Sequence, residues 1–249
     1  MNRIYWDIDK IASLTDHLEA ATHSHGMIQF FLFLRGTPEM KVGKDRIHDR
    51  CLFVNVNVKH AVKFSDGLLF TCVIEPASDM GRKLSALLDG QDYYAIDDAK
   101  TEELIALARP MTSAFSKESY TKLMQKLYEV IGAGSSEKKL DERITAFLSM
   151  LENCSCTDHS VDHFAEELHL SSSRLSHLFS EQVGITLKDY LLLHQLERVF
   201  QDILSGRKIT DAAMDAGFDS PSHFASTVKR LMGLPARSTI KDSEFLKVY

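Results

Sequence analysis

The sequence has few of the patterns that mark secreted, membrane or catalytic proteins. Its 249 residues include only four cysteines, which show neither the spacing of a disulfide framework nor a paired CxxC motif. No secretory signal, lipidation motif or membrane-length apolar run is visible. Phosphate-binding glycine loops and the spacing of a Ser/His/Asp nucleophile are missing as well. We therefore expect a cytoplasmic protein with reduced thiols, no catalytic residues, no cofactor and no membrane partner.

One cluster near the middle of the chain contains residues that ligate metals. Cys154, Cys156, Asp158 and His159 follow one another closely. Their spacing differs from that of structural zinc sites, which usually separate paired ligands by two to four residues. We do not expect a metal there.

Composition and charge indicate two domains. The length and the 44% hydrophobic content suffice for two cores. A small, polar segment, GAGSSEKK at 132–139, reads as a linker. We therefore divide the chain into 1–136, with a net charge of −2, and 137–249, with a net charge of −4. Because the linker has no apolar face, the two parts should fold separately.

The first part begins with short runs of strand-forming residues. The runs are IQFFLFL, EMKVG, CLFVNVNV, AVKF and LLFTCVIE, and turn signals such as Gly43-Lys44 separate them. Several short strands at close spacing predict a small β-barrel or sandwich, which we assign as a cupin-like barrel over about residues 1–80. With helices over about 81–132 and in the second part, the fold class is α+β.

Polar residues accompany the first long strand run. His23, His25 and Gln29 share parity, so on one strand they would face the same side, and His60 follows a later run. The pattern resembles that of the cupins, His-x-His, Glu, Gly and a distant His, with Gln29 in place of the glutamate. Loss of the carboxylate should lower metal affinity. Three readings stay open: a catalytic metal, a vestigial or effector-contacting pocket, or structural histidines.

Two helices are expected over 102–132. Their apolar residues recur at helical intervals, and Pro110 should break or kink the first helix. These stripes either cap the barrel or pair two chains. We assign Leu123, Leu127 and Ile131 to a dimer seam.

Residues 217–233, GFDSPSHFASTVKRLMG, read as a tight turn followed by a helix. Gly217 suits the turn, while Ser220 and Pro221 suit the N-cap and first helical position. A short helix with small inner residues precedes the turn at 208–216. Such a pair is typical of a helix-turn-helix, whose second helix enters the major groove of DNA.

A second copy of this pattern lies upstream at 160–184. Leu175, Phe179 and Gly184 precede Phe224, Val228 and Gly233 by 49 residues each. Ser160 is a candidate N-cap, and Ser171 begins the second helix of this unit. A continuous helix of about 30 Å over 186–206 should connect the units, close to the repeat of one DNA turn. The residues expected to face DNA are Ser172, Ser173, Arg174, Ser176, His177, Ser222, His223, Ser226, Thr227, Lys229 and Arg230.

The stretch from about Asp141 to Thr239 resembles the tandem helix-turn-helix domain of the AraC/XylS family of transcriptional regulators. Departures from the family pattern are Gln195, Ala212, Val228 and Pro235. The matching residues are Ala165, Ser171, Leu175, Phe179, Gly184, Tyr190 and Leu196 in the first unit and Ile209, Ala213, Gly217, Phe218, Ser222, Phe224, Lys229 and Gly233 in the second.

This resemblance implies a function and partners. Relatives carry a cupin-like effector domain before the DNA-binding units, which agrees with the histidine pattern of the first part. It implies binding to double-stranded promoter DNA as a homodimer, control by a small-molecule effector at His23, His25, Gln29 and His60, and contact with RNA polymerase. The alternative is a metal-dependent cupin enzyme fused to a DNA-binding tail. Residues 137–249 are acidic overall. Attraction to DNA phosphates should therefore concentrate in the second helix-turn-helix unit, where basic residues gather.

Overall fold

The computed structural model describes residues 2–7, 9–36, 38–65, 67–132, 139–153, 160–232 and 243–248. The chain forms two compact units, residues 1–137 together with 228–249, and residues 138–227. Most of the predicted linker and the group from Cys154 to His159 lie outside the described residues. Among the helices of the described part, none has the length and apolarity that a membrane crossing requires.

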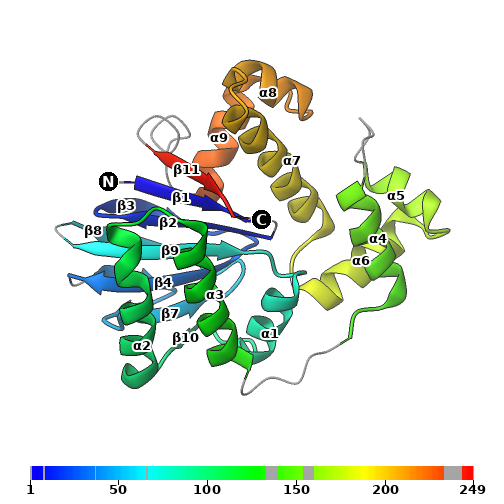
Figure 1. The fold of residues 1–249 in the computed structure, drawn as a ribbon. Helices are drawn as coiled ribbons and strands as arrows, with labels where there is room; N and C mark the ends of the chain where they lie inside the picture. The colour runs from blue at the N-terminus through cyan, green and yellow to red at the C-terminus, as the bar shows by residue number, and fades with distance from the viewer. Residues whose placement is uncertain are drawn as a thin grey trace. The chain divides into compact units, whose positions relative to one another are not determined.

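Two β-sheets build the first unit (Figure 1). Neighbouring strands are antiparallel except β1 and β11, which are parallel. The seven-stranded sheet has the order β10 (Tyr93–Ala95), β7 (Cys51–Val54), β4 (Ile28–Arg35), β9 (Leu68–Ile74), β2 (Lys10–Thr15), β1 (Asn2–Trp6) and β11 (Glu244–Lys247). The four-stranded sheet has the order β3 (Leu18–His23), β8 (His60–Phe64), β5 (Glu39–Val42) and β6 (Asp45–Ile47).

The α+β class and the five predicted strand runs are confirmed, as β4, β5, β7, β8 and β9. The predicted barrel is not closed, because the strands of the described residues form two separate hydrogen-bonded sheets. The remaining strands were not predicted. Of these, β6 and β10 are three residues long, too short for a period-two pattern.

Strand β4 is buried on both faces, which explains its continuous apolar run. Phe30 and Leu32 pack in the cluster shared with the helices. Phe31 and Phe33 belong to a second cluster, whose side chains come from both sheets. The space between the sheets is therefore an apolar interior with β4 along one side.

Three helices and a 3₁₀ turn follow β9, with β10 between the first two helices, and α2 and α3 lie across the large sheet in Figure 1. Pro110 lies in the 3₁₀ turn that ends α2, so the predicted break is confirmed. The elements are α1 (Asp79–Leu88), α2 (Asp98–Ala108), η1 (Arg109–Thr112) and α3 (Lys117–Gly132).

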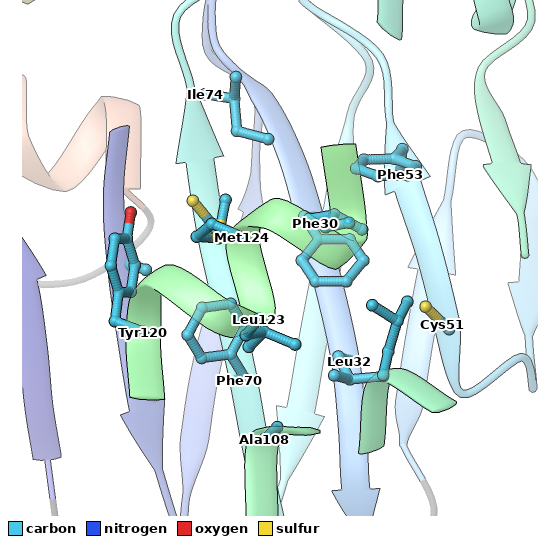
Figure 2. Close-up of a cluster of buried hydrophobic side chains, with 14 of the residues drawn as sticks. Phe30, Leu32, Cys51, Phe53, Phe70, Ile74, Ala108, Tyr120, Leu123 and Met124 are labelled. Carbon is cyan, nitrogen blue, oxygen red and sulfur yellow. The ribbon is translucent and has the colours of Figure 1, made fainter. Parts of the chain in front are cut away.

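The dimer seam assigned to Leu123, Leu127 and Ile131 is wrong. These side chains are at most 1% exposed, and they pack in the same cluster as the large sheet. Figure 2 shows Leu123 among Phe30 and Phe70 of that sheet. The amphipathic stripe of α3 is thus used within the chain, because the sheet face needs a cover.

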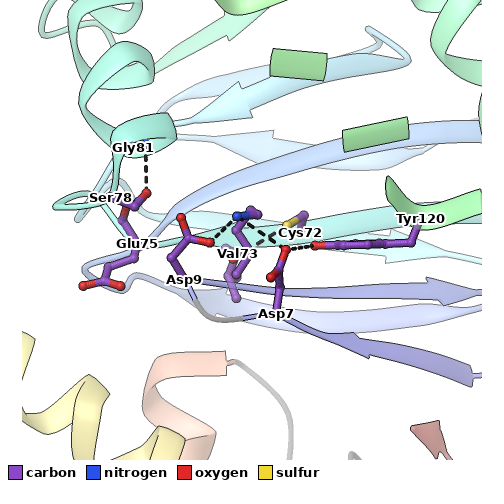
Figure 3. Close-up of polar contacts among 9 residues, drawn as sticks. Asp7, Asp9, Cys72, Val73, Glu75, Ser78, Gly81 and Tyr120 are labelled. Carbon is purple, nitrogen blue, oxygen red and sulfur yellow. Dashed lines mark hydrogen bonds and ion pairs between the residues drawn. The ribbon is translucent and has the colours of Figure 1, made fainter. Parts of the chain in front are cut away.

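A polar network fixes α3 to the turn between β1 and β2 (Figure 3). The Tyr120 hydroxyl donates to Asp7 Oδ2 at 3.0 Å, and Lys10 Nζ lies 3.5 Å from the same oxygen. Lys10 also contacts Asp9. Burial is the main cause that raises the pKa of Tyr120, so the phenol stays protonated and can donate.

In the described residues six helices follow α3, and they contain the two predicted helix-turn-helix units. The connector is one continuous helix of 18 residues, as predicted, and spans about 27 Å at 1.5 Å per residue. The helices are α4 (Glu142–Asn153), α5 (Val161–Glu167), α6 (Ser172–Val183), α7 (Leu187–Leu204), α8 (Ile209–Asp215) and α9 (Pro221–Met232).

Aromatic side chains hold each helix-turn-helix unit together. In the first, the ring of Phe147 on α4 lies 5.2 Å from Phe164 and 5.5 Å from Phe179. In the second, Phe218 lies 5.4 Å from Phe224. Gly217 adopts a φ of 90° in the turn between α8 and α9, which favours glycine.

Candidate nucleic-acid interface and histidine cluster

The two recognition helices, α6 and α9, begin with the same cap. Ser171 Oγ accepts a hydrogen bond of 3.2 Å from the backbone N–H of Arg174. Ser220 Oγ accepts one of 3.0 Å from the backbone N–H of His223, which confirms the predicted cap. The two serines are 49 residues apart, so the repeat includes the start of each recognition helix.

Most of the predicted DNA-facing residues of α9 are exposed. Ser222, His223 and Ser226 are open to solvent, as are the basic pair Lys229 and Arg230. His223 Nδ1 lies 3.2 Å from Asp219 Oδ2. This surface combines hydrogen-bonding side chains with two positive charges.

Thr227 does not belong to this surface, so its assignment as a DNA-facing residue is wrong. Its exposure is 3%. It follows Phe224 by three residues, and residues at this spacing lie on the same face of a helix. Thr227 was assigned to the exposed face because its hydroxyl group makes the side chain polar.

The first recognition helix exposes fewer side chains. Ser173, Arg174 and His177 are exposed on α6, whereas Ser172 and Ser176 are half-buried. The Ser172 hydroxyl donates to a carboxylate oxygen of Asp162 on α5, so it has a partner within the unit. Arg174 and His177 are therefore the strongest donors that α6 offers.

The basic residues near the second helix-turn-helix unit differ in whether nearby carboxylates compensate their charge. Arg207 Nη1 lies 2.7 Å from Asp202 Oδ2, and the same guanidinium contacts Asp215. Its charge is thus compensated within the unit. Lys208 is exposed at the start of α8. Arg237 and Lys241 lie outside the described residues.

The four polar residues predicted to form a site in the sheet-containing unit lie close together, although the elements that carry them differ from those predicted. His23 ends β3, His25 lies in the turn before β4, and Gln29 is on β4. The expectation that they share one strand is therefore wrong. His60 begins β8 and pairs in register with His23.

The cluster is held by short polar contacts. Nε2 of His25 and Nε2 of His60 each lie 2.9 Å from Gln29 Oε1. The ring centroids of His23 and His60 are 4.3 Å apart. His25 and His60 are buried, whereas His23 and Gln29 are half-buried. His60 also contacts the Phe31 ring, at the end of the apolar interior.

Burial keeps these imidazoles neutral. Desolvation is the main cause that lowers the pKa of His25 to about 4 and the pKa of His60 to about 3. It also lowers the pKa of His23. At neutral pH the cluster thus offers lone pairs rather than positive charge.

Thr71 is a member of the cluster that the sequence did not reveal. Its hydroxyl donates to the Phe30 carbonyl at 2.8 Å and accepts from Gln29 Nε2 at 3.2 Å. The residue lies on β9, and no motif links it to the histidines, because the contact depends on how β4 and β9 pair.

Comparisons with known proteins place the helical region in a family. Residues 164–242 match the model of the helix-turn-helix domain. The chain is also 26% identical over 227 residues to the probable transcriptional regulator LumQ of Photobacterium leiognathi, covering 85% of this chain and 88% of the relative. The helical region therefore contains a helix-turn-helix domain, and the chain is similar to a transcriptional regulator over most of its length.

The whole fold resembles solved structures. ToxT from Vibrio cholerae matches with a TM-score of 0.57 and 13% identity, over 92% of this chain and 97% of that chain. A structure of unsaturated fatty acid-bound ToxT from the same species matches with a TM-score of 0.55 and 14% identity, over 92% and 93%. The likeness shows that a sheet-rich unit combined with helix-turn-helix units is a known architecture.

Proposed function

We propose that this regulator binds promoter DNA through α6 and α9 and that a ligand held in the first unit controls the binding. The observation that carries the DNA-binding proposal is the repeated recognition helix, capped by Ser171 in one copy and Ser220 in the other. Each copy follows a short helix across a tight turn, which is the arrangement that lets the second helix enter the major groove.

The two copies are proposed to contribute unequally. In α9, Lys229 and Arg230 attract phosphates, while Ser222 and His223 reach base edges. In α6, Arg174 and His177 make the corresponding contacts. Because α9 has the larger positive charge, its contacts should dominate affinity and its dependence on salt.

Ligand control is proposed from the histidine cluster. It combines a few convergent polar groups with the apolar interior between the sheets, as small-molecule sites do. ToxT, which shares the fold, has been solved with an unsaturated fatty acid bound. A homodimer, contact with RNA polymerase and a cytoplasmic location complete the proposal, and the dimer surface must differ from the buried stripe of α3.

Mapping of bound DNA across the genome, followed by footprinting of the strongest site, tests the proposal. Wild-type protein should protect two segments about one DNA turn apart. Arg174→Ala should weaken one segment and the double variant Lys229→Ala/Arg230→Ala the other. Lys122→Ala, which removes an exposed lysine from α3, is the matched control. Equal protection by all four proteins would contradict the assignment of α6 and α9.

Control by ligand is tested separately. Gln29→Ala should still bind the footprinted fragment but should lose the change in affinity that cell extract or effector produces. An effector changes DNA affinity only by its unequal affinity for two conformations, typically about 5- to 150-fold. A Gln29→Ala protein that responds like wild type would contradict this part of the proposal.

A further inference from the structure

The hydrogen-bond donors and acceptors of the histidine cluster do not balance. Nδ1 of His60 lies 2.9 Å from the Val58 carbonyl oxygen. A carbonyl oxygen only accepts, so Nδ1 carries the proton. Since a neutral imidazole has a single N–H, Nε2 of His60 then holds a lone pair. His23 has the same arrangement, with Nδ1 at 2.8 Å from the Ala21 carbonyl oxygen.

The orientation of Gln29 is also fixed. The Thr71 hydroxyl gives its hydrogen to the Phe30 carbonyl, so it can only accept from Gln29. The amide nitrogen therefore faces Thr71, and Oε1 faces the histidines. As a result, the lone pairs of Gln29 Oε1 and of Nε2 of His60 face each other across 2.9 Å.

Two facing acceptors repel each other unless a positive centre lies among them. In the other tautomer of His60, Nε2 carries the proton and Nδ1 holds the lone pair. The repulsion then lies between Nδ1 and the Val58 carbonyl oxygen. A second proton on His60 would satisfy both contacts, but it would place an unsolvated positive charge on a ring that is 2% exposed. A cation bound by the lone pairs removes the conflict with all groups in their neutral forms.

We propose that His23, His25 and His60, together with Gln29, hold one divalent transition-metal ion. One ring nitrogen from each histidine lies within 4.8 Å of the others. Ligand atoms around a tetrahedral zinc ion are about 3.4 Å apart, so rotations that move these atoms by about 1 Å complete the site. Hydrogen bonds from Nδ1 to backbone carbonyls are the usual supports of such ligands.

The donor set also defines the class of ion. Imidazole nitrogens suit zinc, copper, nickel, cobalt and iron, whereas calcium and magnesium require oxygen ligands. All four side chains are neutral, so none compensates the charge of the ion. The amide of Gln29 should therefore give a weaker site than a carboxylate would. The sequence left open whether these histidines bind a metal, and this inference decides in favour of the metal.

The experiment uses the full chain after treatment with a chelator and measures titration with Co²⁺ by its visible absorption bands. Wild type should bind one ion per chain at this site. His23→Ala and His60→Ala should each weaken binding at least about tenfold, while Gln29→Glu should tighten it. His48→Ala is the matched control, because His48 is exposed on the same unit.

Folding of each variant is checked through the fluorescence of Trp6, the one tryptophan of the chain. If His60→Ala fails to fold, then His23→Ala and Gln29→Glu decide, since both positions are half-buried. The proposal is overturned if wild type binds no ion or if folded His23→Ala binds as tightly as wild type. It is also overturned if only the double variant Cys154→Ser/Cys156→Ser loses the ion.

Metal control of DNA binding rests on the proposed function, whereas metal binding itself is measured without DNA. Fluorescence anisotropy of the footprinted fragment, with and without Co²⁺, provides the second readout. Metal binding with unaltered DNA affinity would uphold the site and contradict ligand control through it. An absent metal signal with normal DNA binding would remove the site and leave the DNA-binding function intact.

Discussion

The backbone N–H of Val248 donates a 2.9 Å hydrogen bond to the carbonyl oxygen of Trp6, so the last strand of the described chain is joined to the first. Around this bond β11 runs parallel to β1, with Ile4 opposite Phe245. Val248 is 5% exposed and packs in the core shared by the large sheet and its helices. The end of the chain thus covers an edge strand that would otherwise be open to pairing.

Val248→Ala should lower the free energy of unfolding of the first unit by about 2 kcal/mol, because it removes two buried methyl groups and leaves a cavity. Urea unfolding followed by Trp6 fluorescence measures the change. Lys247→Ala is the control, since that side chain is exposed on the same strand. Equal stability of Val248→Ala and wild type would show that the packing of β11 contributes nothing.

The buried thiols should resist modification in the folded protein. Burial is the main cause that raises the pKa of Cys51 to about 12, and it raises the pKa of Cys72 further. At pH 8 iodoacetamide should therefore label Cys51 and Cys72 only after unfolding, as read by mass spectrometry. Rapid labelling of Cys51 in native protein would contradict its position in the core.

The raised pKa of the same thiols predicts that the free energy of unfolding falls at alkaline pH. The unfolded thiol releases its proton near pH 9, whereas folded Cys51 keeps its proton to about pH 12. Between these values the folded state binds more protons, so stability falls as pH rises. Urea unfolding of wild type and Cys51→Ala from pH 8 to 11 should show a shallower fall in the variant. Parallel curves would exclude Cys51 as a cause.

Lys229→Ala/Arg230→Ala should weaken binding to all DNA sequences and reduce the slope of log K against log salt by about 2. His223→Ala should instead change the preference at particular base pairs and leave the salt slope unchanged. Binding titrations at several salt concentrations separate the two effects. An unchanged slope in the double variant would mean that these side chains do not contact phosphates.

Thr227→Val should leave DNA affinity within about twofold of wild type, because the side chain is buried and cannot reach a base. The substitution keeps the shape of the residue and removes only its hydroxyl. Lys229→Ala, two positions away on the exposed face, is the comparison. A loss of affinity in Thr227→Val that matches Lys229→Ala would restore Thr227 to the DNA-contacting surface.

Local signals in the sequence determined most of the helical region. The caps at Ser171 and Ser220, the turn at Gly217 and the continuous α7 all depend on residues within a few positions of each other. Capping and helical spacing act over that range, so one sequence suffices to find them. The repeat of 49 residues then identified the second unit.

Tertiary structure decided what depends on distant partners. The stripe of Leu123 and Leu127 specifies an apolar face, but only the position of the sheet shows that this face is used within the chain. Likewise, Thr71 reaches Gln29 because β4 and β9 pair in one register, 42 residues apart in sequence. Sequence periodicity reports which side of an element is apolar, whereas the element that covers that side is selected by packing of the whole chain.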